Sequence, residues 1–114
     1  QVILKEGFAA YPSDLLECDV VALGSYDAFS LMGGGLKDFL DRAYYPPQGQ
    51  VTDKPYAAFL THGGGGRAIE NIETIAHSFK LKKVADSLLI KGRPEGQALV
   101  DLKEFGARLA AAAE

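Results

Sequence analysis

An uninterrupted apolar run at residues 19–24, DVVALG, constrains the fold of this chain more than any other feature. A strand with one face in water alternates apolar and polar residues, whereas a strand covered on both faces is apolar throughout. Other short β-branched or aromatic runs occur at residues 2–4, 55–61, 84–85 and 88–90, and helical patterns lie between these runs. This alternation predicts βαβ units around an open parallel sheet, an α/β fold with 19–24 as its central strand.

Four helices are expected around these strands. Ser13, which follows Pro12, is placed to accept a hydrogen bond from the first turn of a short helix and so to cap it. Two longer helices and a C-terminal helix are indicated by apolar residues that recur every three or four positions: Leu36, Phe39, Leu40 and Ala43; Ile69, Ile72, Ala76 and Phe79; and Ala98, Leu102, Phe105 and Leu109. The segment 44–49 ends the first of the longer helices, because each of its prolines disfavours helical geometry in the residue before it.

Length and charge bound the classes of function. The chain of 114 residues fits one compact domain whose core needs no metal or disulfide. Twelve Lys and Arg against fifteen Asp and Glu give a net charge of −3 without a basic run, so we expect neither a nucleic-acid partner nor a membrane partner. Cys18 is the only cysteine, so we expect a buried or half-buried thiol without chemistry and a reducing, cytoplasmic location.

Two unusual loops, 25–34 and 61–66, follow neighbouring strands of the predicted sheet. Ligands bind at the carboxyl ends of the strands in such a sheet. The first loop carries two aromatic rings and a methionine, which suit a flat ligand, in a segment that is otherwise solvated. The second has four consecutive glycines before a helix, so a ligand can approach its amides and the positive end of that helix. The pair predicts a site for a planar, partly anionic ligand, with these candidate residues: Ser25, Tyr26, Asp27, Ala28, Phe29, Ser30, Met32, Gly33, Thr61, His62, Gly63, Gly64 and Gly65.

Each of these features has an alternative interpretation. The aromatic residues and the methionine of the first loop could cover the sheet end or form an oligomer contact, and the glycine run could be a mobile turn. His62 could be a hydrogen-bonded histidine without a role in binding. The spacing Gly63-x-Gly65-x-x-Ala68 also fits the dinucleotide fingerprint, but too little chain follows it for the rest of that unit. No residues have the spacing of metal ligands.

Several segments together carry a resemblance to a known family: GSYDAFS at 24–30, GGLKDFLDR at 34–42, KPYAAF at 54–59, HGGG at 62–65 and KGRP at 91–94. They resemble the flavodoxin-like superfamily, especially its flavodoxins and small FMN-binding NAD(P)H-dependent reductases, over nearly the whole chain. The resemblance implies a three-layer αβα fold with an open parallel sheet, and FMN as cofactor. It also implies that the two loops pack on the isoalloxazine ring and hydrogen-bond to it. Family members often carry Pro and Tyr where this chain has Tyr26 and Ala28.

The same resemblance implies a sheet that is incomplete at the N-terminus. Flavodoxin-like chains begin with a strand and a Ser/Thr-rich loop that holds the FMN phosphate, so residues 2–4 match the family's second strand. In the family's strand order the missing strand lies between two that are present, which leaves a gap of roughly 9.6 Å between them. We therefore expect 1–114 to be a single flavodoxin-like domain that is a fragment lacking its first strand and helix. A sheet that is rearranged, or completed by another chain, is the alternative.

These inferences predict an FMN-binding, flavodoxin-like redox protein that carries electrons through its bound flavin. One alternative is an enzyme, an NAD(P)H-dependent FMN or quinone reductase, which needs room for a nicotinamide beside the ring. The other is a non-redox binding module with a vestigial flavin site. The expected partner is a redox partner protein or NAD(P)H, and self-association into a homo-oligomer is a further expectation.

Overall fold

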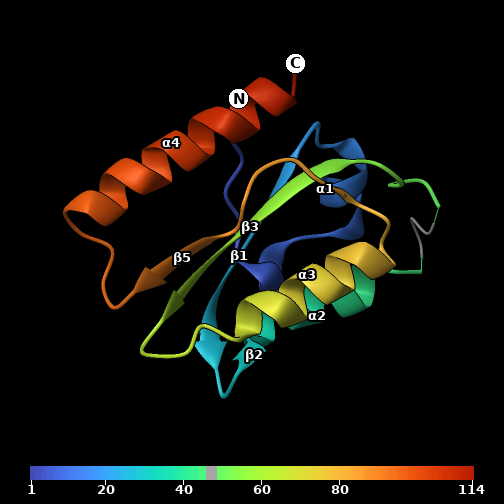
Figure 1. Ribbon diagram of the computed structural model, residues 1–114. Coiled ribbons are helices and arrows are strands. Elements are labelled where there is room, and N and C mark those ends of the chain that lie inside the picture. Colours follow the sequence, from blue (N-terminus) through green and yellow to red (C-terminus); the bar gives the residue numbers. More distant parts are fainter. Residues whose placement is uncertain (46–48) are drawn as a thin grey trace.

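The computed structural model describes residues 1–45 and 49–114, and its centre is a mostly parallel β-sheet (Figure 1). The two longest strands, β1 (Val21–Ala28) and β3 (Pro55–His62), lie side by side in parallel. The other edge of β3 pairs in parallel with β4 (Lys82–Lys83) near its start and with β5 (Leu88–Lys91) near its end. β2 (Leu31–Met32) is the exception, because it pairs antiparallel with the end of β1. The expected α/β fold with a parallel sheet is confirmed, apart from the antiparallel pairing of β2 with β1.

Helices cover both faces of this sheet, which gives the expected three-layer αβα arrangement (Figure 1). The 3-10 helix η1 (Gly7–Ala9) and helices α1 (Pro12–Glu17), α2 (Gly34–Ala43) and α3 (Ala68–Ser78) lie on one face. Helix α4 (Gln97–Ala112) lies on the opposite face, where it contacts β3 and β5. α2 ends at Ala43, before the segment that was predicted to end it, and residues 46–48 of that segment lie outside the described residues.

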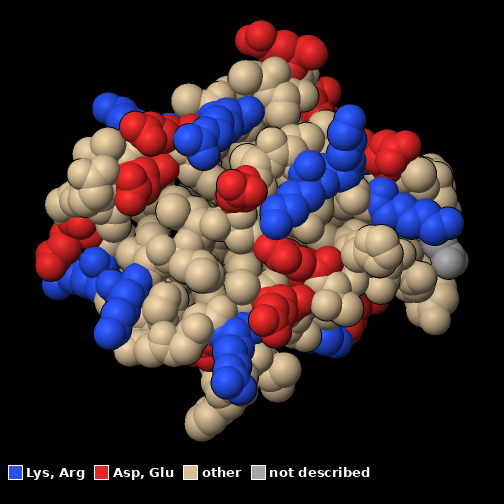
Figure 2. All heavy atoms as spheres, viewed as in Figure 1, with Lys and Arg blue, Asp and Glu red and all other residues tan. Residues whose placement is uncertain are grey.

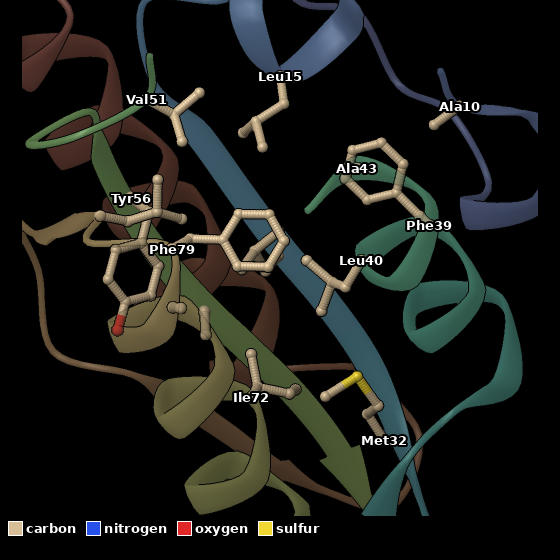
Figure 3. Close-up of a cluster of buried hydrophobic side chains, with 14 of the residues drawn as sticks. Ala10, Leu15, Met32, Phe39, Leu40, Ala43, Val51, Tyr56, Ile72 and Phe79 are labelled. Atoms are coloured by element: carbon tan, nitrogen blue, oxygen red, sulfur yellow. The ribbon is translucent and has the colours of Figure 1, made fainter. Parts of the chain in front are cut away.

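The main hydrophobic core fills the space between the sheet and helices α1, α2 and α3 (Figure 3). The predicted apolar stripes of α2 and α3 supply much of it, and its largest completely buried side chains are Leu15, Val51, Leu60 and Ile72. A smaller cluster under α4 contains Ala57, Phe105 and Leu109. There the rings of Phe59 and Phe105 meet edge to face, with centroids 5.8 Å apart. The apolar faces read from the sequence are therefore the faces that the helices bury.

The strand expected at residues 2–4 does not form. These residues have no regular secondary structure, and the side chains of Val2 and Leu4 are more than nine-tenths exposed, at 93% and 92%. A strand needs a hydrogen-bonded neighbour for its backbone groups. The edge of β1 that faces away from β3 pairs only with β2, at Asp27 and Ala28, so no described strand lies beside 2–4.

The central strand is less covered than the apolar run 19–24 predicts. It begins at Val21, and Ala22 is exposed, because the helix on that face of the sheet lies against β3 and β5. The strand expected at 84–85 forms at Lys82–Lys83 instead. The pairing with β3 ends there with a bond from the N–H of Val84, and 84–85 pack half-buried against the smaller cluster.

The start of α1 also differs from the prediction that Ser13 caps it. Pro12 is the first helical residue, a position that suits proline because its missing N–H would have no partner there. The carboxylate of Asp14 accepts a hydrogen bond from the backbone N–H of Tyr11 at 2.7 Å. This bond lowers the pKa of Asp14, and the ion pair with Lys5 lowers it further.

No described helix is long and apolar enough to cross a membrane. Figure 2 shows basic and acidic side chains interspersed over the face of the molecule that it presents. Within 1–45 and 49–114, no cluster of His, Cys, Asp and Glu side chains is arranged to hold a metal ion. Cys18 is half-buried, as expected, and burial raises the pKa of its thiol, which keeps it protonated at neutral pH.

Candidate functional site

The carboxyl ends of β1 and β3 lie side by side, so the two candidate loops meet at one edge of the sheet (Figure 1). Tyr26, near the end of β1, lies opposite Thr61, near the end of β3. Thr61 and His62 are the last residues of β3, and both are partly buried. The fold thus brings together the two segments that the sequence singled out.

The first segment is a hairpin rather than the open loop expected at 25–34. β1 continues through Ala28, and β2 returns antiparallel beside it. The turn residues Phe29 and Ser30 both have positive φ, 55° and 66°. Two left-handed residues match the twist of a tight hairpin, but each costs about 1 kcal/mol or more when it is not glycine. The usual Asn-Gly signal of such a turn is absent, which is why the sequence did not reveal the hairpin.

The hairpin leaves two aromatic rings exposed. The side chain of Phe29 is 100% exposed and that of Tyr26 is 59% exposed. The ring of Tyr26 lies over Gly33, where an added Cβ would come within 2.6 Å of the ring atom Cε1. Glycine at position 33 therefore makes room for the ring. Both rings are available to stack on a flat ligand.

The other candidate residues of the first segment hold the hairpin in place. The hydroxyl of Ser25 accepts a hydrogen bond from the N–H of Gly33 at 2.7 Å and donates one to the carbonyl of Tyr26 at 2.8 Å. The side chain of Met32 is only 5% exposed and packs in the main core (Figure 3). Ala28 is half-buried at the end of β1. Met32 therefore contributes packing rather than exposed surface.

The second segment is an open glycine turn, 63–66. Its first three glycines are exposed, and a Cβ added at Gly63 or Gly64 would meet nothing within 4 Å. The positive φ of this turn, 67°, belongs to Gly66. A Cβ there would lie 3.2 Å from Cδ2 of His62. The turn therefore needs glycine at its last position, whereas its first positions expose backbone that a ligand can approach.

His62 carries an unsatisfied polar atom. Its Nδ1 is buried without a hydrogen-bond partner among the described residues, so the protein's own groups do not make it a fully hydrogen-bonded histidine. The carbonyl of His62 accepts a hydrogen bond from the N–H of Gly92 at 2.7 Å. Gly92 has a φ of 77° and follows β5, so a third loop borders the site. The turn signal Gly-Arg-Pro at 92–94 could have pointed to it.

Two polar side chains fasten the hairpin to α3. The carboxylate of Asp27 accepts hydrogen bonds from the N–H of Ala68 at 3.1 Å and from that of Ser30 at 2.8 Å. These two bonds, that of Ala68 first, lower the pKa of Asp27, which is therefore charged at neutral pH. Asn71 accepts a bond from the N–H of Met32 at 3.2 Å. Sequence reasoning missed Asn71, because nothing local to an asparagine within a helix reveals a partner on a distant hairpin.

The assembled edge offers features that suit a planar ligand. It combines exposed aromatic faces from the hairpin with accessible backbone from the glycine turn. Aromatic faces stack on flat rings, and free backbone N–H groups bind ring oxygen and nitrogen atoms. Two hollows among the described residues lie elsewhere, one beside Tyr44 and Phe79 and the other between α4 and Leu88.

Comparisons with known proteins bear on the fold. No family model and no curated protein matches the sequence. A flavodoxin from the domain Archaea matches with a TM-score of 0.78 at 21% identity, over 94% of this chain and 73% of that one. A flavodoxin from Streptococcus pneumonia TIGR4 matches with a TM-score of 0.79 at 18% identity, over 94% and 75%. An NADPH-quinone reductase from P. pentosaceus matches with a TM-score of 0.56 at 14% identity, over 90% and 69%.

Proposed function

The chain has the flavodoxin-like fold, and on that basis we propose that it binds FMN at the carboxyl edge of its sheet and carries electrons through the bound flavin. One observation carries the proposal: two exposed aromatic rings lie beside an open glycine backbone at the ends of neighbouring parallel strands. The likeness to solved flavodoxins supports FMN as the ligand.

The residues at this edge fit a flat ring with polar edges. Phe29 and Tyr26 supply aromatic faces, and Gly63 and Gly64 leave the backbone beside them unhindered. The buried, unpartnered Nδ1 of His62 is the kind of atom whose missing partner is a ligand or an ordered water. Aromatic area, free amides and an unsatisfied polar atom therefore coincide at one place.

Bound FMN supplies the electron chemistry, because flavins take part in both one-electron and hydride transfer. The chain's own residues bind the ring and set its surroundings. Phe29 and Tyr26 would hold the ring by stacking and shield one side of it from water, and the amides of the glycine turn would donate hydrogen bonds to its edge. Because both aromatic side chains are exposed, a ring held against them would stay within reach of a second molecule, which an electron carrier requires.

An NAD(P)H-dependent reductase is the second candidate, and the likeness to an NADPH-quinone reductase favours it. A reductase needs space for a nicotinamide to stack on the flavin, whereas a carrier needs only an accessible ring edge. Steady-state oxidation of NADPH with FMN and a quinone present separates the two. We expect no sustained turnover, together with reversible reduction of bound FMN by a chemical reductant. Sustained turnover would replace the carrier by the reductase.

Flavin absorbance distinguishes a redox protein from a non-redox binding module with a vestigial site. Each charge-assisted phosphate contact is worth about 1.5–3 kcal/mol, so a site that lacks several of them loses its ligand. We expect the full product of the gene to purify with a flavin spectrum. A colourless product that also binds no added FMN would support the binding module and reject the flavin proposal.

We also propose that a further strand completes the sheet. The edge of β1 that faces away from β3 has no strand paired with it along residues 21–26 among the described residues, and this stretch carries no Lys or Pro, the residues that proteins use to protect a free edge. This strand comes from polypeptide ahead of Gln1 or from another chain, and brings the loop that holds the FMN phosphate. FMN titrations of the 114-residue chain and of the full gene product test this. We expect tight binding only by the latter, and equal affinities would contradict it.

A redox partner protein is the proposed partner of the carrier, and NAD(P)H is that of the reductase. We place the protein in the cytoplasm, where its half-buried Cys18 stays reduced.

The exposed ring of Phe29 is also a contact available for self-association. Light scattering with and without the substitution Phe29→Ala tests that contact.

The exposed rings give the first mutational prediction. The double substitution Phe29→Ala with Tyr26→Ala is expected to weaken FMN binding about tenfold, because stacked aromatic pairs contribute about 0.5–1.5 kcal/mol each beyond buried area. The control is Asp38→Ala with Asp41→Ala on α2, whose charges contribute a few tenths of a kcal/mol. Fluorescence titration with FMN compares the two. If the helix variant binds as poorly as the hairpin variant, the hairpin is not part of the ring site.

The glycine turn gives the second mutational prediction. Gly64→Val and Gly65→Val are expected to weaken FMN binding about fivefold or more, because a branched side chain blocks approach to the backbone. The melting temperature should stay nearly unchanged, since neither residue has positive φ and neither added Cβ comes closer than 3.7 Å to a neighbour. Gly106→Val, an open position on α4, is the control. Early melting with unchanged FMN affinity would make the run a structural turn only.

A further inference from the structure

A single carboxylate joins the hairpin turn to the start of α3, the helix that follows the glycine turn. One oxygen of Asp27 accepts a hydrogen bond from the N–H of Ser30 in the hairpin turn. The other accepts a hydrogen bond from the N–H of Ala68, the first residue of α3. The N–H of a first helical residue has no carbonyl partner within its own helix. Because Ala68 is completely buried, the carboxylate of Asp27 takes the place of water there.

The bond to Ser30 also holds a strained turn. Phe29 and Ser30 both lie in the left-handed region, which only glycine adopts without cost. Nothing packs on the ring of Phe29, since its side chain is wholly exposed. The direction of this ring therefore depends on the backbone of the turn, and the carboxylate of Asp27 fastens that backbone.

Other bonds hold the rest of the hairpin. The hydroxyl of Ser25 accepts a hydrogen bond from the N–H of Gly33, and the side chain of Asn71 accepts one from the N–H of Met32. Met32 is also buried in the main core. Loss of the Asp27 carboxylate should therefore leave the hairpin in place, while it frees the turn and the start of α3.

We propose that Asp27 is a positioning residue that couples the hairpin turn to the glycine turn, so that Phe29 and Gly64 act on a ligand as one unit. Asp27 does this through backbone N–H groups on both sides, rather than by contact with the ligand. The effect on binding rests on the proposed FMN site, whereas the coupling is a property of the protein alone. The two parts therefore have separate tests.

Amide hydrogen exchange without ligand tests the coupling. Asp27→Ala should speed exchange about tenfold or more at both Ser30 and Ala68, because each loses a hydrogen bond to a charged group. Asp27→Asn, which keeps one acceptor oxygen, should restore slow exchange at one of the two amides. Asp41→Ala removes an acidic charge from α2 and should change neither. Unchanged exchange at both amides in Asp27→Ala would overturn the proposal.

A double-mutant cycle with FMN tests the consequence for binding. In the background that keeps Asp27, the combined loss of FMN affinity from Phe29→Ala and Gly64→Val should differ about threefold or more from the product of the two single losses, as for coupled residues. With Asp27→Ala present, the two losses should simply multiply. Simple multiplication in both backgrounds would overturn the role of Asp27 in the site. If the full gene product without these substitutions binds no FMN, the proposed function fails, and hydrogen exchange still decides the coupling.

Discussion

Replacing Ile72 with alanine is expected to lower the free energy of unfolding by about 3 kcal/mol, within the range for large apolar side chains removed from a packed core. Ile72 is completely buried on the sheet-facing side of α3, in the main core (Figure 3). The change removes apolar area and leaves a cavity that the surrounding strands and helices cannot close. Urea unfolding followed by circular dichroism measures the loss as a shift of the midpoint at constant slope.

Thr74→Ala is the matched control for this experiment. Thr74 lies on the same helix, two residues further on, and is exposed. Surface substitutions of this kind change stability by no more than about 0.5 kcal/mol. Equal midpoints for the two variants would show that α3 does not pack on the sheet through Ile72.

Replacing Gly7 with alanine is expected to cost about 3 kcal/mol as well, for a different reason. A Cβ at this position would lie 2.0 Å from the carbonyl oxygen of Gly35 and 2.8 Å from the nitrogen of Leu36, so η1 and the start of α2 cannot stay together. Both obstacles are backbone atoms, so no side chain can turn aside to relieve the overlap. Overpacking of this kind lies at the upper end of its usual cost of about 1–3 kcal/mol.

The separation of η1 from α2 also breaks polar bonds. The guanidinium group of Arg42 donates to the carbonyl of Gly7 at 2.9 Å and to that of Ala10 at 2.8 Å, which fixes η1 on the helix. The melting temperature should fall by about 10 °C or more in Gly7→Ala. Gly34→Ala is the control, because its added Cβ meets only Phe8, at 3.9 Å. Similar melting of the two variants would contradict the close approach of the two backbones.

Helix positions were largely readable from the sequence. The apolar stripes predicted for α2, α3 and α4 are buried as expected, because the period of a helix shows in residues three or four apart. The strands were predicted less completely than the helices. Residues 2–4 have a strand-like composition but no neighbour to bond, and pairing is a property of two segments rather than one.

The candidate site divides in the same way. Local composition pointed to the two segments, because aromatic residues and a run of glycines are visible in the sequence itself, and the fold brings these segments to one edge of the sheet. It did not show that Met32 turns into the core or that Gly66, rather than Gly64 or Gly65, has positive φ. Both facts depend on packing against other parts of the chain.

The sequence by itself therefore determined the α/β class, the positions of the longer helices and the edge at which a ligand is expected. These follow from patterns a few residues long, whose physical basis is the burial of one face of each element. Only the tertiary structure decided that residues 25–32 form a hairpin, that no described strand pairs with the outer edge of β1 along 21–26, and that Asp27 accepts a hydrogen bond from Ala68. The bond joins residues 41 positions apart. Such contacts arise from the packing of β1 against β3 and α3, and no short stretch of sequence contains both partners.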